Sequence, residues 1–337
     1  MIVRDNEDLA PFHTFGVHVR CKLLLTVESI EELREALKMY PFAKVLGGGS
    51  NILILEDLDE PVIRIALHGR TEWTRATDKE RDVVIEIAAG ENWHAFVTWC
   101  VENDLGGLEN LALIPGTVGA APMQNIGAYG IEQERCFVEL KAMDRATGEI
   151  HRFDNTACRF GYRTSVFKEE LFNRYIITSV AYRLTRPPHH VHATYKDVMQ
   201  ELSAVADPSI EDVYDAVVRI RTRKLPDPAD MGNAGSFFKN PVVSRSVFDR
   251  ISHDYDSVPH YELPNGDVKI PAAWLIDQCG WKGYRKDEVG VHDRQPLVLV
   301  NLGNAEGQDI FDLSDNILKS VHERFGISLD REVNVWK

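Results

Sequence analysis

The stretch Lys44-Val-Leu-Gly-Gly-Gly-Ser-Asn-Ile-Leu-Ile54 sets three consecutive glycines between two short β-like runs. Glycine lets the main chain approach a ligand closely, and main-chain amides turned inward in such a nest bind anions. A phosphate group is therefore the expected ligand of these main-chain amides. The spacing matches neither the G-x-G-x-x-G dinucleotide fingerprint nor the P-loop, so a flexible hairpin is as consistent with the pattern as a phosphate cradle.

A second glycine-rich stretch, residues 114–130, carries no charged side chain. A solvated loop would be more polar, so the composition predicts that this stretch packs against something large and flat. A buried cofactor ring and close packing of backbone on backbone both satisfy that requirement. Thr117, Gln124 and Asn125 would supply its hydrogen-bonding groups.

Around these two stretches, apolar periodicity predicts alternating strands and helices. Ser29 and Glu32 form a capping-box pattern, which predicts a helix directly after Ser29. The other predicted helices are residues 93–101, a helix after Ser209, and 309–325. The predicted strands are residues 17–26, 61–67, 83–89, 137–143, 149–153, 176–184 and 297–300, with a last strand containing Glu332.

The helix after Ser209 ends in a cluster of cations, Arg219, Arg221, Arg223 and Lys224. In an acidic chain, such a cluster beside a glycine-containing loop indicates an anionic substrate. A solvated helix end, favoured by the helix dipole, is the alternative interpretation.

The loop that follows reads Met231-Gly-Asn-Ala-Gly-Ser-Phe-Phe-Lys-Asn-Pro241. It places the hydroxyl of Ser236 between a glycine and two aromatic residues, so a flexible turn presents a polar group to an apolar wall. Lys239 and Asn240 add a cation and an amide close by. The plainer interpretation is a glycine-containing turn before a strand.

Two further groups of polar residues allow competing interpretations. Arg159 and Arg163 lie among aromatic residues, which suits an arginine held rigidly for a carboxylate, although a structural ion pair is the commoner role. His189 and His190 follow two prolines. Because no third ligand stands at metal spacing, we predict an exposed loop there and no metal site.

The composition excludes several classes of protein. A formal net charge of −14 over 337 residues argues against non-specific binding to nucleic acid or to an anionic membrane surface. The five cysteines are scattered without a Cys-x-x-Cys pair, which argues against a disulfide scaffold and is typical of a reducing cytoplasm. Charges near the N-terminus interrupt any signal-like apolar run, so we predict a cytoplasmic protein.

Six motifs taken together resemble the UDP-N-acetylenolpyruvoylglucosamine reductase family. They are Leu46-Gly-Gly-Gly-Ser-Asn51, Ile114-Pro-Gly-Thr-Val-Gly119, Gln124-Asn-Ile-Gly-Ala-Tyr-Gly130, Tyr162-Arg-Thr-Ser-Val-Phe-Lys168, Gly232-Asn-Ala-Gly-Ser-Phe-Phe-Lys-Asn-Pro241 and Arg331-Glu-Val333. The resemblance spans nearly the whole chain in the right order, and the segment around Tyr195 suggests the longer subtype, which carries a tyrosine loop. His13 departs from the pattern, because the family usually has asparagine there.

The resemblance implies an α+β fold: a two-part FAD-binding unit of the vanillyl-alcohol-oxidase type and a separate α+β substrate-binding domain. The expected division is residues 1–70 and 71–224 for the FAD-binding subdomains, the second completed by 326–337, and 225–325 for the substrate domain. FAD would be bound non-covalently, because the glycine loop offers no histidine or cysteine. The implied FAD-binding residues are Gly47, Gly48, Gly49, Ser50, Asn51, Ile114, Pro115, Gly116, Thr117, Val118, Gln124 and Gly127.

The same resemblance implies the reaction and its catalytic residues. NADPH would supply hydride through FAD to UDP-N-acetylglucosamine enolpyruvate, giving UDP-N-acetylmuramate for peptidoglycan, with the chain acting as a monomer. Arg163 and Glu332 would stabilise the enolate-like intermediate, and Ser236 would deliver the proton. Without the resemblance, the plainer interpretation of Glu332 is an ordinary exposed strand residue. The positions that match the family's nucleotide-sugar ligands are Tyr195, Lys224, Asn240, Tyr261 and Gln295.

Two other classes of protein remain as alternatives on sequence grounds. A flavin oxidase or dehydrogenase of the same wide fold would bind FAD and consume an alcohol. A catalytically silent nucleotide-sugar binding protein would keep the cations near Lys224 and bind its ligand without turnover. A flavin spectrum and its anaerobic bleaching by NADPH would separate the three.

Overall fold

The computed structural model describes residues 1–73 and 82–337, which form two compact units. Unit 1 consists of residues 1–7, 21–49 and 59–223, and unit 2 consists of residues 8–20, 50–58 and 224–337. Residues 74–81 fall within the predicted subdomain 71–224 and lie outside the described residues. The finer division at residues 70 and 225 stays a prediction.

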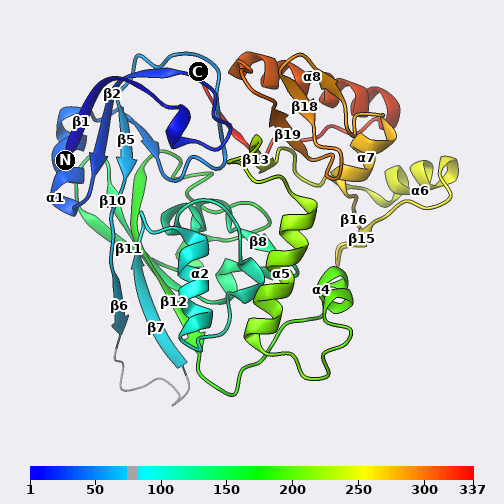
Figure 1. Cartoon of the computed structure of the whole chain (residues 1–337), viewed down its shortest axis with the longest axis horizontal. Helices are drawn as coiled ribbons and strands as arrows, with labels where there is room; N and C mark the ends of the chain where they lie inside the picture. The colour runs from blue at the N-terminus through cyan, green and yellow to red at the C-terminus, as the bar shows by residue number, and fades with distance from the viewer. Residues whose placement is uncertain (74–81) are drawn as a thin grey trace. The chain divides into compact units, whose positions relative to one another are not determined.

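Unit 1 carries eleven of the described strands and the helices α1 to α5, many of which are labelled in Figure 1. Its strands are β1 Ile2–Asp8, β2 Arg20–Val27, β3 Lys44–Leu46, β5 Val62–Ile65, β6 Arg70–Trp73, β7 Asp82–Ala88, β8 Gly127–Ala128, β9 Ile131–Glu132, β10 Phe137–Asp144, β11 Ile150–Asp154 and β12 Tyr175–Thr185. Its helices are α1 Ile30–Met39, α2 Trp93–Glu102, α3 Asn155–Cys158, α4 Lys196–Glu201 and α5 Ile210–Lys224.

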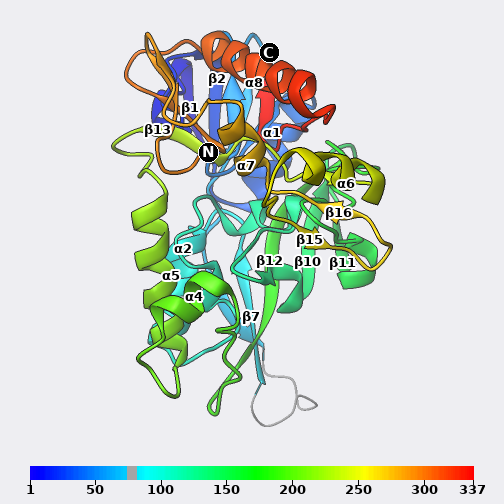
Figure 2. The same ribbon diagram turned by 90° about the vertical axis from the view of Figure 1, so that its right-hand side faces the viewer.

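Unit 2 combines short strands with three helices. The strands are β4 Ile52–Ile54, β13 Gly232–Ser236, β14 Val242–Val243, β15 Tyr261–Glu262, β16 Val268–Lys269, β17 Arg285–Lys286, β18 Val289–Val291, β19 Val298–Asn301 and β20 Asn334–Trp336. The helices are α6 Arg245–Asp254, α7 Ala272–Gln278 and α8 Gly307–Phe325. Figure 2 shows β15 and β16 side by side beneath α6.

The main sheet of unit 1 has five strands in the order β11-β10-β12-β7-β6, and all of its pairings are antiparallel. Figure 2 shows β7, β12, β10 and β11 running alongside one another. Alternate residues of β7, such as Val83, Ile85 and Ile87, join one core with apolar side chains of α2 and α5. The period-2 pattern of β7 and the helical period of α5 therefore meet in one buried layer.

A second sheet of unit 1 has the order β1-β2-β5-β3, with β2 and β3 both parallel to β5. Helix α1 packs on it through Leu33, Ala36 and Leu37. Ser29 caps α1 by accepting a hydrogen bond from the Glu32 amide at 3.1 Å. The Glu32 carboxylate binds the Glu28 amide, so the capping box is offset by one residue from the predicted arrangement.

The two runs beside the triple glycine belong to different ladders. β3 pairs with β5 in unit 1, whereas β4 pairs in parallel with β20 in unit 2. The interpretation of residues 44–54 as a flexible hairpin is therefore wrong. In unit 2, α8 begins at Gly307, where an added Cβ would lie 1.9 Å from the carbonyl oxygen of Ile54, so only glycine fits.

The remaining predicted elements are present with shifted ends. The strand predicted at 17–26 is β2, which starts only at Arg20, and the helix predicted at 309–325 is α8, which starts at Gly307. Gly326 ends α8 with φ +68°. All five cysteines are free thiols. No helix in the described part of the chain combines the length and apolar character needed to cross a membrane.

Candidate active site residues in the two units

Two glycine loops of unit 1 approach each other through their main chains. A Cβ added to Gly48 would lie 2.8 Å from the Cα of Gly116, and one added to Gly47 would lie 3.0 Å from the Oγ1 of Thr117. Gly49 and Gly116 also have φ values of +63° and +114°, which favour glycine. The charge-free stretch thus packs directly on the triple glycine, backbone on backbone.

The loop at Gly116 is fixed in place by the start of α2. The Trp93 amide donates to the Gly116 carbonyl at 3.1 Å, and the Val118 amide donates to the Glu91 carbonyl at 2.9 Å. The result is an uncharged rim of main chain and one hydroxyl, with no Cβ where the two loops meet. Such a rim suits a diphosphate, because peptide groups can approach its oxygens closely. The residues present therefore fit the phosphate part of FAD.

Ser50 and Asn51 continue the glycine loop within unit 2. The Asn51 side chain donates to the main-chain carbonyl of Glu332 at 3.2 Å. The Asn334 amide in turn donates to the Asn51 carbonyl at 3.1 Å. Asn51 is thus joined to the segment that carries Glu332, a connection that no sequence pattern indicated.

Ser236 is the last residue of β13, so the stretch predicted as a turn before a strand is itself the strand. The pairing of β13 with β19 is irregular between Asn233 and Ser236, where Gly235 has φ +67°. Ser236 is exposed, and the next two residues, Phe237 and Phe238, are almost fully buried. The two phenylalanines are buried, as an apolar wall requires, but Ser236 is exposed to solvent at the irregular end of the β13–β19 pairing.

Glu332 lies beside the Ser236 segment. Its amide donates to the carbonyl of Phe237 at 2.8 Å, and the Lys239 amide donates to the carbonyl of Asp330 at 2.9 Å. Glu332 is only 9% exposed, so the interpretation of an ordinary exposed strand residue is wrong. Glu332 also lies outside the last strand, because β20 begins at Asn334.

Arg163 and Arg159 differ in their surroundings, although both have left-handed backbones. Arg159 is exposed and forms an ion pair with Glu170, so the structural interpretation holds for it. Arg163 is half-buried and donates through Nη2 to the Gly127 carbonyl at 2.8 Å. This bond ties the predicted catalytic arginine to a predicted FAD-binding residue. The neighbouring Lys168 reaches Gln124, with 3.5 Å between Nζ and Oε1.

Tyr195 precedes α4 and lies against Tyr129, with ring centroids 5.5 Å apart in an edge-to-face arrangement. Burial raises the pKa of Tyr129 and lowers the pKa of Arg221, which donates to the Leu113 carbonyl at 3.2 Å. Tyr129 was not among the predicted site residues. Its place inside the glycine-rich stretch was the only signal that could have found it.

The cation cluster at the end of α5 divides into two parts. Arg219 and Arg223 both bind the carboxylate of Glu201, at 3.0 and 3.1 Å. They therefore hold α4 against α5, which is a structural role. Arg221 and Lys224 are the members of the cluster that remain candidates for an anionic ligand.

His189 and His190 lie in a loop, as predicted, and His190 is exposed. The prediction of exposure is wrong for the side chain of His189. Its ring is within hydrogen-bonding distance of Asp104 at 2.9 Å and of Thr185 at 3.1 Å, and its side chain is only 11% exposed. It is thus a structural residue of unit 1. Across the described residues, no group of three or more metal-ligating side chains forms a metal site.

The other predicted nucleotide-sugar ligands lie in unit 2. The Oδ1 of Asn240 accepts from the Ala272 amide at 2.9 Å, at the start of α7. Tyr261 is half-exposed, with the Lys269 ammonium 5.5 Å from its ring centroid. Gln295 accepts at its main-chain carbonyl from the Val298 amide at 3.0 Å. Their roles as ligands stay a prediction.

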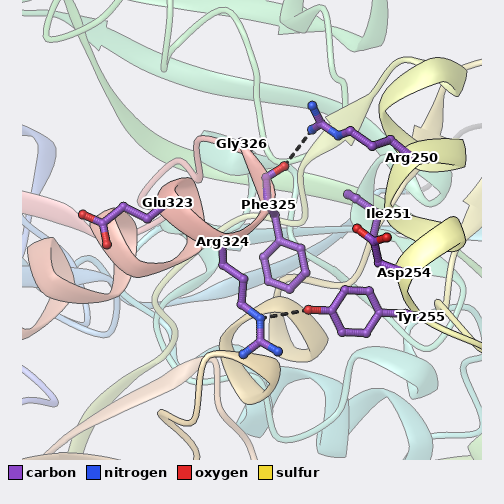
Figure 3. A pocket seen from close by; sticks show the side chains of 8 residues that line it. All are labelled: Arg250, Ile251, Asp254, Tyr255, Glu323, Arg324, Phe325 and Gly326. Carbon is purple, nitrogen blue, oxygen red and sulfur yellow. Dashed lines mark hydrogen bonds between the residues drawn. The ribbon is translucent and has the colours of Figure 1, made fainter.

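Unit 2 has a cavity of about 570 Å³ between α6 and the end of α8 (Figure 3). Arg250 donates to the Phe325 carbonyl at 2.8 Å, and Arg324 donates to the hydroxyl of Tyr255 at 2.8 Å. Both arginines are thus used in holding the two helices together. None of the predicted site residues is among the eight described residues that line this cavity.

Comparisons with known proteins agree with the architecture. The family model of an FAD binding domain matches residues 21–154, and that of the UDP-N-acetylenolpyruvoylglucosamine reductase C-terminal domain matches residues 227–336. The UDP-N-acetylenolpyruvoylglucosamine reductase of Flavobacterium johnsoniae is 46% identical over 99% of this chain and 100% of its own length. That of Pseudomonas aeruginosa is 45% identical over 99% of both chains.

Among solved structures, the UDP-N-acetylenolpyruvylglucosamine reductase (MurB) of Thermus caldophilus matches with a TM-score of 0.69 at 26% identity, and the match covers 100% of both chains. Together these matches define an FAD-binding oxidoreductase, and they confirm the predicted α+β architecture of an FAD-binding unit and a separate C-terminal domain. The chain belongs to the UDP-N-acetylenolpyruvoylglucosamine reductase family.

Proposed function

We propose that the protein catalyses the NADPH-dependent reduction of the enolpyruvyl group of UDP-N-acetylglucosamine enolpyruvate to UDP-N-acetylmuramate, a step of peptidoglycan precursor synthesis. Family membership supports the reaction class. The observation that carries the residue assignment is the hydrogen bond between the Glu332 amide and the Phe237 carbonyl. It joins the segment of the proposed proton donor, Ser236, to the segment of a buried carboxyl group.

The cofactor would be FAD, held non-covalently. Its diphosphate would lie on the rim formed by residues 47–51 and 114–118, which offers main-chain amides and hydroxyls and carries no histidine or cysteine. Gln124 and Gly127 would lie nearer the flavin ring. When bound, FAD would take hydride from NADPH and pass it to the terminal carbon of the enolpyruvyl group.

Side chains of the protein would stabilise and then neutralise the negative charge that develops on the substrate. Addition of hydride to the terminal carbon of the vinyl ether leaves negative charge on the adjacent carbon and its carboxylate. The guanidinium of Arg163 would oppose that charge, and Glu332 would act in its protonated form, because a bare carboxylate would repel it. The hydroxyl of Ser236 would then protonate the adjacent carbon. Serine is a weak acid, so the strong basicity of the intermediate must drive this transfer.

The nucleotide part of the substrate would be bound by cationic and hydroxyl groups. We assign its diphosphate and uridine to Tyr195, Lys224, Asn240, Tyr261 and Gln295. The edge-to-face contact of Tyr195 with Tyr129 supports a role that uses its hydroxyl, since the ring is already held by packing. The free thiols support a cytoplasmic location.

The test is to follow the flavin of the purified holoprotein under nitrogen. We expect a yellow protein that NADPH bleaches and that UDP-N-acetylglucosamine enolpyruvate then reoxidises with formation of UDP-N-acetylmuramate. A protein that binds the sugar nucleotide without reoxidation would be the silent binding protein. Reoxidation by oxygen alone, with no product, would identify an oxidase.

A further inference from the structure

Two segments of unit 1 are tied together by four side-chain hydrogen bonds. One segment is residues 123–127 of the charge-free stretch, and the other is residues 161–168, which contains Arg163. The bonds run from Asn125 Nδ2 to the Gly161 carbonyl at 3.3 Å, from Arg163 to the Gly127 carbonyl at 2.8 Å, from the Ser165 hydroxyl to the Met123 carbonyl at 2.7 Å, and from Lys168 to Gln124 at 3.5 Å. We call these two segments the clamp.

Asn125 of the clamp is fully buried, with 0% of its surface exposed. Its Nδ2 donates to the Glu132 carboxylate at 3.2 Å and to the Gly161 carbonyl at 3.3 Å. Its Oδ1 accepts from the Gln133 side chain and from the Glu134 amide, both at 3.2 Å. The amide of asparagine has two donor and two acceptor positions, so all four are used.

Behind Asn125, the hydrogen-bond chain continues into the core. Gln133 is fully buried, and its Oε1 accepts from the hydroxyl of Tyr182 at 3.0 Å. Tyr182 is a residue of β12, and its ring packs edge-to-face on Trp93 of α2, with centroids 5.7 Å apart. Asn125 is therefore anchored to the main sheet, which makes it a rigid support.

Asn125 also contacts the turn that contains Arg163, through its hydrogen bond to Gly161. Gly161 and Thr164 exchange two main-chain hydrogen bonds of 3.2 Å, so Tyr162 and Arg163 form the tip of a tight turn. Arg163 has φ +55°, a backbone conformation that a non-glycine residue rarely adopts. Such a conformation persists only where surrounding contacts fix it. The bond from Asn125 to Gly161 fixes one arm of this turn, and Ser165 fixes the other.

We propose that Asn125 is a positioning residue for the reaction, and that it sets the place of Arg163 relative to the substrate carboxylate through the Gly161 carbonyl. This inference rests on the proposed function, in which Arg163 opposes the charge that develops on the enolpyruvyl group. Asn125 itself touches no reacting atom. Its effect on the rate therefore depends on the presence of the Arg163 guanidinium.

Only asparagine satisfies both requirements of this position. Its φ is +45°, which asparagine tolerates better than most residues other than glycine. Aspartate would keep the two acceptor contacts through one oxygen, but its other oxygen, in the place of Nδ2, would face the Glu132 carboxylate and the Gly161 carbonyl without a proton to donate. Glycine would accept the backbone conformation and lose all four side-chain bonds.

The test compares Asn125→Gly with the parent holoenzyme in the two flavin half-reactions. We expect reduction by NADPH within about twofold of the parent, and reoxidation by the enolpyruvyl sugar nucleotide slowed by roughly 10-fold to 100-fold, the size expected when a charge-opposing group is misplaced. Asn173→Gly is the matched control. Asn173 is exposed, has φ +60°, and bonds to Arg145 outside the clamp, so it should change neither rate.

A double-mutant cycle separates positioning from a purely structural role. In an Arg163→Ala background, Asn125→Gly should slow reoxidation by less than about twofold, because the group it positions is gone. Equal slowing in both backgrounds, or equal slowing of both half-reactions, would overturn the proposal. Thermal unfolding by circular dichroism shows whether each variant is folded. If Asn125→Gly is not, Asn125→Asp, which keeps the acceptor contacts, takes its place in the same cycle.

The parent protein distinguishes this inference from the function on which it rests. If the parent is not reoxidised by the enolpyruvyl sugar nucleotide, the proposed function is wrong. If the parent turns over and Asn125→Gly reoxidises at the parent rate, the proposed function stands and the positioning role of Asn125 is wrong.

Discussion

The main-chain amide of Glu332 donates a 2.8 Å hydrogen bond to the carbonyl of Phe237, the residue that follows Ser236. A hydroxyl from one segment and a buried carboxyl group from another are thereby carried on adjoining stretches of main chain in unit 2. The bond is between peptide groups, so substitution of either side chain leaves it intact. Each side chain can therefore be removed without separating the two segments.

Ser236→Ala should separate the two halves of the reaction. Reduction of the flavin by NADPH needs no proton on the substrate, so bleaching should keep its normal rate. Reoxidation should slow by roughly 10²-fold to 10⁴-fold, the usual contribution of a positioned acid. Stopped-flow absorbance under nitrogen measures both steps. Ser244→Ala, at an exposed serine of unit 2, is the control, and reoxidation of Ser236→Ala at the parent rate would show that this serine is only a strand residue.

Gly48→Ala and Gly47→Ala should differ, although the glycines are neighbours. The new Cβ at position 48 meets the main chain of Gly116 at 2.8 Å, whereas that at position 47 meets a side-chain hydroxyl, Thr117 Oγ1, at 3.0 Å. A hydroxyl can rotate away and a backbone cannot. We expect Gly48→Ala to lose FAD and melt at a lower temperature, and Gly48→Val to be worse. FAD content per chain after gel filtration measures this, and stoichiometric FAD in Gly48→Ala would refute the close approach.

Tyr195→Phe should weaken binding of the sugar nucleotide and leave flavin reduction by NADPH nearly unchanged. Phenylalanine keeps the edge-to-face contact with Tyr129 and removes only the hydroxyl. Titration of the oxidised holoprotein with the substrate gives the dissociation constant. Tyr214→Phe is the matched control, because its hydroxyl bonds to Thr98 at 2.8 Å and should affect stability alone. A loss of both binding and flavin reduction in Tyr195→Phe would argue for a role in the fold.

Glu86→Gln should lower stability in a way that depends on pH. Burial alone would raise the pKa of Glu86, but hydrogen bonds from Lys141, Ser179 and Trp73 outweigh it and hold the pKa below 4.5. Because the folded pKa is depressed, the contribution is present above about pH 4.5 and is lost as the pH falls through the folded value.

The expected size for Glu86→Gln is about 1–2 kcal/mol at pH 7, because charged hydrogen bonds are partly screened at a half-buried site. Urea unfolding at pH 7 and at pH 3.5 should show the gap between parent and variant closing at the lower pH. Glu72→Gln, in an exposed ion pair with Arg186, should have little effect at either pH. A gap of the same size at both pH values would contradict the assignment.

Much of the fold could be predicted from local patterns. Periodicity located β7, β12 and α5, because each has one face in a single buried core, and Ser29 marked the start of α1. The partners of β3 and β4 could not be predicted in this way. Two apolar runs around three glycines resemble a hairpin, and only distant segments reveal that each run belongs to a separate ladder.

The contacts of the candidate site also could not be predicted from local patterns, because they come from distant segments. The motifs selected Ser236, Arg163 and Glu332, but periodicity suggested an exposed strand for Glu332, whereas Phe237 and Asn51 enclose its main chain. Asn125 was noted only as a hydrogen-bonding group. Its four partners come from residues 132, 133, 134 and 161, and no spacing rule connects them. Arg219 and Arg223 suggested a ligand, and Glu201 binds both.

The parallel pairing of β4 with β20 also constrains the time course of synthesis. Asn51 binds Glu332, 281 positions later in the chain, and its carbonyl accepts from Asn334, 283 positions later. At about 5–20 residues per second, a ribosome needs tens of seconds to make the second partner after the first. Throughout that interval the apolar run Ile52–Ile54 lacks its strand partner, next to the glycines of unit 1. We therefore expect the nascent chain to depend on chaperones until its last strand emerges.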